Sequence, residues 1–168
     1  DLVARTQTRQ HLPAFCEQSG ISALSVVQLL KYLVYWLIPG EKYLSGLIRP
    51  DPALSAAIKA LGSMGIRTNL DLLQQGLTWE RRQALAQASG LPEEMVHRLV
   101  NIADLSRLPW ASKATIANIL GAGYGSLSAL ANANPEKLYA DFFSYGQSIG
   151  KNLKQGNEIE NSHRIARL

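Results

Sequence analysis

Two segments of the chain resemble each other at an offset of 58 residues, and this internal repeat limits the possible folds more than any other feature. The first segment reads IKALGSMGIRTNLDLL and the second reads IANILGAGYGSLSALA. Upstream of them, Leu47 matches Leu105. Five further pairs keep the same character: Ile58/Ile116, Leu61/Ile119, Gly65/Gly123, Thr68/Ser126 and Leu72/Leu130. The repeat predicts two copies of one unit, each made of two helices joined by a turn.

The residues at the ends of these segments are those that begin and end helices. Gly65 suits the left-handed conformation in which many helices end, and Thr68 with Asp71 forms a variant of the capping box. The next helix is expected to begin after Thr78 and to point three side chains inward, namely Trp79, Leu85 and Ala86. No stretch alternates between apolar and polar residues over a useful length, so we predict an all-α fold without a sheet.

Composition divides the chain into three predicted parts. Residues 1–46 contain a polar arm and an apolar helix, residues 47–145 contain the repeats, and residues 146–168 form a polar tail. The tail is expected to be a weak amphipathic helix or a mobile end. The most apolar stretch of the chain, residues 21–38, lies in the first part.

The repeat region resembles a bacterial family defined only as a domain of unknown function. Three motifs carry the resemblance: a GI-x-T-x-x-x-L-L turn (Gly65, Ile66, Thr68, Leu72, Leu73), an R-x-x-L-A helix (Arg82, Leu85, Ala86) and an aDL-x-R linker (Ala103, Asp104, Leu105, Arg107). The resemblance covers roughly Leu47 to Ala140. It implies tandem helix-hairpin-helix units, and it says little about function.

Both expected hairpins depart from the pattern of helix-hairpin-helix units that bind nucleic acid. Such units approach phosphate through a glycine–hydrophobic–glycine hairpin with free backbone N–H groups. Residues 49–52 read RPDP and residues 108–112 read LPWAS, so neither hairpin has the glycines. The expected fold class is therefore all-α, with tandem degenerate helix-hairpin-helix repeats preceded by an apolar N-terminal helix.

The apolar stretch of residues 21–38 has three interpretations. It is a buried central helix, a helix that docks on a partner or at a membrane interface, or a membrane span at the lower limit of length. A span would place Gln28 and Lys31 near the bilayer centre, which is unfavourable for the lysine. For a docking helix, the residues expected to contact a protein are Leu30, Leu33, Val34, Trp36 and Leu37.

The charge of the chain permits several partners. Charged residues make up 18% of the sequence and the net charge is +4. The low charge content favours a chain that docks against a protein or a larger assembly, whereas the positive balance permits nucleic acid or an anionic membrane surface. Nucleic-acid binding through the repeats would use a basic face and a glycine-rich loop, with candidate residues Arg81, Arg82, Arg107, Lys113, Gly123 and Gly125.

No pattern of catalytic or metal-binding residues stands out. The three histidines lie far apart in sequence, and Cys16 is the one cysteine. We therefore expect no enzyme activity, no cofactor, no metal and no small-molecule substrate. The predicted function is a non-catalytic helical adaptor or scaffold, located in the cytoplasm or peripheral to a membrane. Sequence-independent DNA binding and peripheral membrane association are the alternatives.

Overall fold

The fold was obtained as a computed structural model that describes residues 10–37, 40–109, 111–153 and 157–167, with the backbone alone for 32–37 and 157–158. Throughout this part of the chain the regular structure is helical. The one β-type pairing among the described residues is an isolated bridge between Tyr43 and Thr68. The predicted all-α class is confirmed. None of the described helices has the length and apolar character that a membrane span requires.

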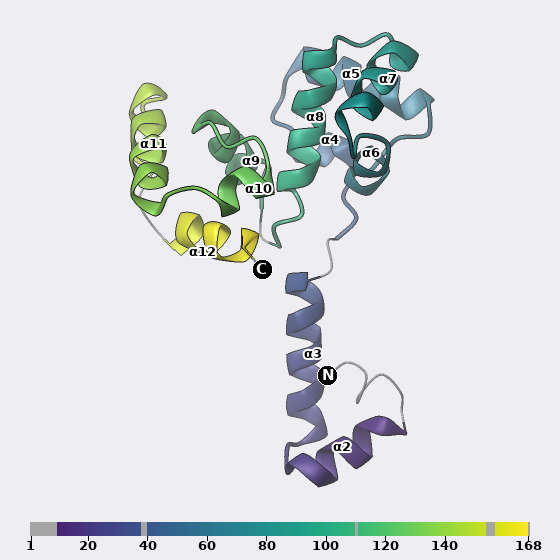
Figure 1. The fold of residues 1–168 in the computed structure, drawn as a ribbon, viewed down its shortest axis with the longest axis vertical. Helices are drawn as coiled ribbons and strands as arrows, with labels where there is room; N and C mark the ends of the chain where they lie inside the picture. The colour runs from purple at the N-terminus through teal and green to yellow at the C-terminus, as the bar shows by residue number, and fades with distance from the viewer. Residues whose placement is uncertain (1–9, 38–39, 110, 154–156, 168) are drawn as a thin grey trace. The chain divides into compact units, whose positions relative to one another are not determined.

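The chain forms two compact units, Asp1–Gly40 and Glu41–Leu168. The first unit contains α2 (His11–Ser19) and α3 (Ala23–Leu37), which pack against each other (Figure 1). The helices of the second unit are α4 (Leu44–Leu47), α5 (Pro52–Ser63), α6 (Asn69–Gln75), α7 (Trp79–Ser89), α8 (Glu93–Leu105), α9 (Lys113–Gly121), α10 (Leu127–Ala131), α11 (Pro135–Ser148) and α12 (Asn157–Ala166). This unit extends on both sides of the predicted repeat region 47–145, since it includes α4 and α12.

The internal repeat corresponds to two helix pairs with the same turn, α5–α6 and α9–α10. In both turns a glycine is left-handed, with φ of 85° at Gly65 and 96° at Gly123. The next residue of each turn donates its backbone N–H to the carbonyl five positions earlier: Ile66 to Leu61 and Tyr124 to Ile119, both at 3.1 Å. This is the Schellman pattern of a helix C-terminus. Two copies of one turn, predicted from the repeat, are thus confirmed.

The second helix of each pair begins at the same repeat position and has the same kind of cap. The Thr68 side chain accepts a hydrogen bond from the Asp71 N–H, and the Asp71 carboxylate accepts from the Thr68 N–H, so the predicted capping box is confirmed. Backbone donation from Arg67 and Thr68 lowers the pKa of Asp71. In the second copy, the Ser126 side chain caps α10. The side chains therefore fix where each second helix starts.

The first helices of the two pairs differ in length. Helix α5 has 12 residues and begins at Pro52, directly after the cap residue Asp51. Helix α9 has 9 residues and begins at Lys113, after the cap residue Ser112. Because Lys113 corresponds to residue 55 in the repeat, α9 starts about one turn later than α5. The two copies are equivalent at the turn and diverge at the segments that precede them.

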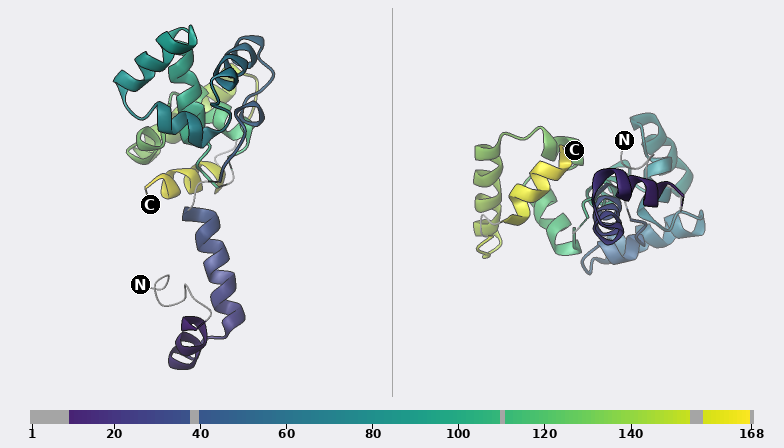
Figure 2. Two further views of the ribbon diagram at one scale, coloured as in Figure 1. Left: turned by 90° about the vertical axis from the view of Figure 1, so that its right-hand side faces the viewer. Right: turned by 90° about the horizontal axis from the view of Figure 1, so that it is seen from below.

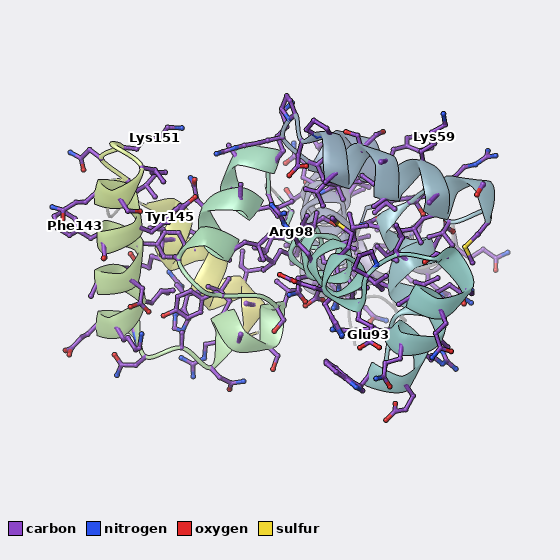
Figure 3. The ribbon with its side chains drawn as sticks, turned by 90° about the horizontal axis from the view of Figure 1, so that it is seen from above. Lys59, Glu93, Arg98, Phe143, Tyr145 and Lys151 are labelled. Carbon is purple, nitrogen blue, oxygen red and sulfur yellow. The ribbon has the colours of Figure 1, made fainter. Side chains whose placement is uncertain are left out.

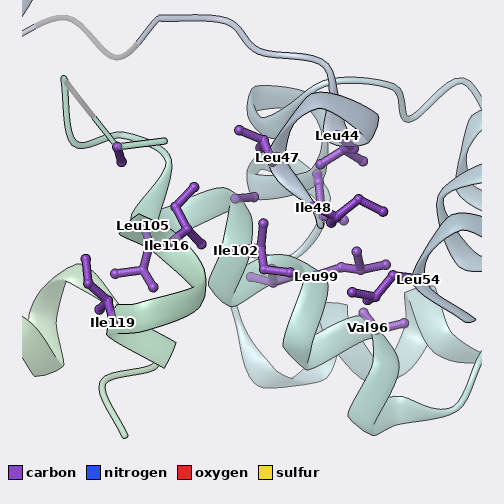
Figure 4. Close-up of a cluster of buried hydrophobic side chains, with 14 of the residues drawn as sticks. Leu44, Leu47, Ile48, Leu54, Val96, Leu99, Ile102, Leu105, Ile116 and Ile119 are labelled. Atoms are coloured by element: carbon purple, nitrogen blue, oxygen red, sulfur yellow. The ribbon is translucent and has the colours of Figure 1, made fainter. Parts of the chain in front are cut away.

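Helix α8 connects the two helix pairs through one continuous core (Figure 4). It contacts α4, α5, α6, α7 and α9. The residues that α8 buries are Val96, Leu99, Val100, Ile102, Ala103 and Leu105. Leu61 from α5 and Ile119 from α9 are also buried in this core. Each Val, Leu or Ile of this set stabilises the fold by about 1.5–3 kcal/mol relative to an exposed one, so this core is a major source of the second unit's stability.

The orientation of Trp79 differs from the prediction. Leu85 and Ala86 are buried as expected, whereas Trp79 is 57% exposed. Trp79 is the first residue of α7, two turns before Ala86 and at the edge of the core. Its ring stacks on His97 of α8, with 4.3 Å between the ring centroids. The indole therefore covers an imidazole at the surface instead of filling the core.

The polar tail contributes a packed helix. Of its two predicted states, an amphipathic helix or a mobile end, the structure shows the helix for residues 157–166. Helix α12 contacts α10 (Figures 1 and 2) and buries Ile159, Ser162 and His163. The His163 Nε2 lies 3.1 Å from the Ala133 carbonyl oxygen. The tail thus belongs to the second unit.

Candidate functional site

A groove with a volume of about 410 Å³ lies in the second unit, where the segment before α5 faces α8, α9 and α11. Both repeats contribute to it, because Leu54 of α5 and Ile116 of α9 lie on its floor. Ile102 of α8 and Leu120 of α9 extend this apolar floor. The volume falls within the range of sites for small ligands. We call this site the basic groove, for the charges described next.

Three cationic side chains and one carboxylate line the basic groove: Arg49, Arg98, Lys113 and Asp51. Figure 3 shows Arg98 between the part of the second unit that contains Lys59 and the part that contains Tyr145. Its guanidinium lies 3.7 Å from the Asp51 carboxylate, and its side chain is 55% exposed. Such a long and solvated ion pair contributes little to stability. The groove therefore has an excess of positive charge that the fold itself does not neutralise.

The other two cations are also weakly engaged. The Arg49 guanidinium is 3.4 Å from the Asn118 Oδ1 and 3.5 Å from the Ala114 carbonyl oxygen. These distances exceed the usual 2.9–3.0 Å of an N–H···O hydrogen bond. The ammonium of Lys113, the first residue of α9, makes no hydrogen bond or ion pair with any described residue. All three cations can therefore donate to a ligand without breaking a strong internal bond.

Tyr145 of α11 forms one wall of the groove, and a glycine permits its position. A Cβ at residue 121 would lie 2.1 Å from the Cζ of Tyr145 and 2.5 Å from its hydroxyl oxygen. The ring thus lies directly against the backbone of α9 at Gly121. Any side chain there would displace the ring, because no real Cβ contact is that short. This close approach adds a phenol to a groove that otherwise presents aliphatic and charged groups.

The candidate nucleic-acid residues are distributed over several parts of the second unit. The Arg81 guanidinium donates to the Gln74 carbonyl at 3.2 Å, and the Arg82 Nε donates to the Gly76 carbonyl at 2.8 Å. Arg107 forms an ion pair with Asp104 at 3.0 Å. Gly123 and Gly125 lie in the turn between α9 and α10. Lys113 is the member of this set that lines the basic groove.

The candidate docking residues lie in α3. Leu30 is half-buried, whereas the side chains of Leu33, Val34, Trp36 and Leu37 lie outside the described residues. The described part of α3 buries Val26 at 2% exposure and leaves Leu24 68% and Leu29 46% exposed. Helix α2 buries no residue at all. Within the described residues of the first unit, α3 therefore presents apolar side chains that α2 covers little.

Sequence reasoning missed the part that Arg49 and Tyr145 play in the basic groove. Within residues 49–52, predicted as a hairpin without the glycines, the Asp51 carboxylate accepts from the Ala53 and Leu54 N–H groups and caps α5. The proline directly after this cap residue favours the helix start that the structure shows at Pro52. No sequence signal relates Gly121 to Tyr145, since only the packing of α11 on α9 brings them together.

The family motifs have structural roles. Arg82 caps the end of α6 through the Gly76 carbonyl. Asp104 accepts a hydrogen bond from the Leu127 N–H at 2.8 Å, so it holds the start of α10 to the end of α8. It also pairs with Arg107. These motifs therefore specify how the helices are joined, and they do not line the basic groove.

Comparisons with known proteins place the repeat region in a family. Searches of curated proteins and of solved structures found no match. A protein-family model matches residues 53–152, which is more than half of the chain and extends from α5 to just beyond α11. With its repeats, its connecting helix and its motifs inside that segment, the chain belongs to the family described as a domain of unknown function, DUF4332.

Proposed function

We propose that this protein is a non-catalytic adaptor that docks on a partner protein or a larger assembly through α3. The observation that carries the proposal is the exposure of apolar side chains on this helix, with Leu24 at 68% and Leu29 at 46%. Docked helices of this kind bury an apolar face in a groove of the partner. The partner is therefore expected to offer an apolar groove that accepts a single helix.

The size of the first unit supports this proposal. It spans 40 residues, and domains this small seldom bury enough surface to be stable without a disulfide, a metal or an association with another chain. Within its described residues, Val26 is the buried apolar side chain. Covering Leu24 and Leu29 would contribute roughly 25 cal/mol for each Å² of apolar surface removed from water. Association with a partner is the simplest source of that burial.

We also infer that the two helix pairs are helix-hairpin-helix repeats in which the phosphate-binding hairpin has been lost. Their common turn and the shared 58-residue offset support this inference. Asp51 lies in the hairpin expected before α5, and its carboxylate accepts from the Ala53 and Leu54 N–H groups that a phosphate-binding hairpin would leave free. The repeats then serve as the scaffold that carries the docking helix.

The first prediction concerns the docking surface of α3. Replacing Leu24 and Leu29 together by aspartate is expected to abolish capture of the partner by the full chain, because a charge at either exposed position of α3 opposes its burial against an apolar surface. The matched control is Leu77→Asp. Leu77 is 68% exposed and lies in the second unit, between α6 and α7. Affinity purification followed by mass spectrometry compares the three proteins, with circular dichroism to verify equal helix content.

Two treatments separate this function from its alternatives. If nuclease treatment releases the captured protein, nucleic acid bridges the two proteins. If the chain co-sediments with anionic liposomes and Leu24→Asp/Leu29→Asp abolishes this co-sedimentation, α3 binds a membrane surface. Sedimentation velocity of the purified chain tests whether α3 docks on a second copy instead. A partner retained equally by the wild type and by Leu24→Asp/Leu29→Asp contradicts the proposal.

A further inference from the structure

We propose that the basic groove binds a small amphipathic anion, in which a phosphate or carboxylate group is attached to an apolar body. This site lies in the second unit and is separate from the docking function proposed for α3. The proposal rests on two properties that the groove combines: weakly engaged cationic donors at its rim, and an apolar floor below them.

The rim suits an anionic head group. Lys113 makes no polar contact with the described residues, and Arg49 and Arg98 make only contacts of 3.4 Å or longer. A phosphate or carboxylate bound among them would replace these by charge-assisted hydrogen bonds of about 2.7–2.9 Å. Asp51 is the one carboxylate on the described lining, so three positive charges face one negative charge and the groove attracts anions.

The floor suits an apolar body. Ala117 and Leu120 of α9 line the groove and are half-buried, next to the buried Leu54, Ile102 and Ile116. Tyr145 lies beside them across Gly121, where its ring offers a flat apolar wall. Free inorganic phosphate would use the rim and leave Ala117, Leu120 and the Tyr145 ring in contact with water. An anion attached to an alkyl or aromatic group would cover both surfaces at once.

A second cleft in the unit shows how the basic groove differs. It has a volume of about 630 Å³ and lies among α5, α6 and α7. Its cation, Arg81, already donates to the Gln74 carbonyl at 3.2 Å. The larger cleft thus offers no comparable set of available donors on its described lining. Volume alone does not select the ligand site; the unengaged positive charge does.

The test uses the full chain labelled with ¹⁵N and titrated with hexyl phosphate, with hexanoate in parallel to compare the two head groups. Inorganic phosphate and hexanol are the controls for the head and the body alone. A ligand of this size is expected to bind with a dissociation constant of about 1 mM. Its amide shifts are expected at Ile116, Leu120 and the residues around Arg49. Each control is expected to bind at least tenfold more weakly.

Substitutions locate the site. Lys113→Met is expected to weaken binding of hexyl phosphate roughly tenfold, since one hydrogen bond to a charged group is lost. The matched control is Lys59→Met, on the outer side of α5 and away from Arg98 (Figure 3), which is expected to leave the affinity unchanged. Tyr145→Phe keeps the wall and tests the hydroxyl alone. Thermal unfolding of each variant verifies that the fold persists.

Four results would overturn the proposal. They are the absence of binding at 10 mM (about ten times the expected constant), shifts confined to α3, equal binding of hexanol or inorganic phosphate, and equal affinities for Lys113→Met and Lys59→Met. A dimer that Lys113→Met converts to a monomer, with no response to hexyl phosphate, would assign the groove to a second copy of the chain instead.

Discussion

At the scale of single residues, Tyr124 in the second repeat turn is buried and has a strongly shifted pKa. The Tyr124 hydroxyl donates to the Asp141 carboxylate at 2.7 Å, and the Lys137 ammonium donates to the same carboxylate. Burial, followed by the hydrogen bond to Asp141, raises the pKa of Tyr124 to about 12. Donation from Lys137, followed by that from Tyr124, lowers the pKa of Asp141. The three side chains therefore tie α11 to the repeat turn.

This arrangement predicts a late step in tyrosine ionisation. In the folded chain Tyr124 holds its proton, whereas in the unfolded chain it loses it near pH 10. The stability that the contact contributes is therefore complete below about pH 10 and is lost as the pH rises towards 12. Absorbance at 295 nm should show one of the six tyrosines ionising near pH 12. That step should disappear in Tyr124→Phe and move to lower pH in Asp141→Asn; a wild-type titration without it would contradict the assignment.

At the scale of helices, the repeat turn offers a test with its own internal control. Gly65→Ala places a Cβ at φ of 85°, which costs about 1–2 kcal/mol because L residues avoid this conformation. Gly62→Ala lies three residues earlier, inside α5 and with no atom within 4 Å of the new Cβ. It should stabilise the helix by about 0.5–1 kcal/mol. Urea unfolding should therefore shift in opposite directions for the two variants, and a shift in the same direction would argue against the left-handed turn.

The helices also show how far sequence alone could reach. The left-handed glycine at Gly65 and the caps at Thr68 and Thr78 follow from local chemistry, and the sequence predicts all three at the residues where they occur. The exposure of Trp79 could not be predicted from the sequence. Trp79 lies on the same face of α7 as the buried Ala86, and it is exposed only because it lies at the edge of the core. Local rules specify where a helix begins; burial depends on which helix lies opposite.

The basic groove could not be predicted for the same reason. Arg49 precedes α5, Arg98 lies on α8, and Lys113 begins α9, so their proximity depends on tertiary packing. Sequence reasoning grouped Lys113 with Arg81, Arg82 and Arg107 because all four lie in the repeats. In the structure the three arginines bind carbonyls or a carboxylate nearby. Positive charge could be counted from the sequence, but the charge available for a ligand could not.

At the scale of the whole molecule, the two units differ in the size of the buried core that stabilises each of them. The buried cluster of the second unit is built from residues between Leu44 and Ile159. The polar network near its start is also internal to that unit: the Lys42 ammonium donates to the Ser106 carbonyl, and the buried Asn69 side chain donates to the Ser106 hydroxyl. The described residues of this core and of its polar network therefore lie within residues 41–168.

The last prediction follows from this division. A fragment of residues 41–168 is expected to unfold cooperatively within about 3 °C of the full chain, because a loss of 1 kcal/mol would shift a domain of this size by about 2–8 °C. A peptide of residues 1–40 is expected to show little helix by circular dichroism, since helices shorter than about 15 residues are marginal in water. It should gain helix when the docking partner is added. A fragment 41–168 that melts well below the full chain would mean that α3 stabilises the repeats, and then its apolar face would serve the fold of this chain instead of a partner.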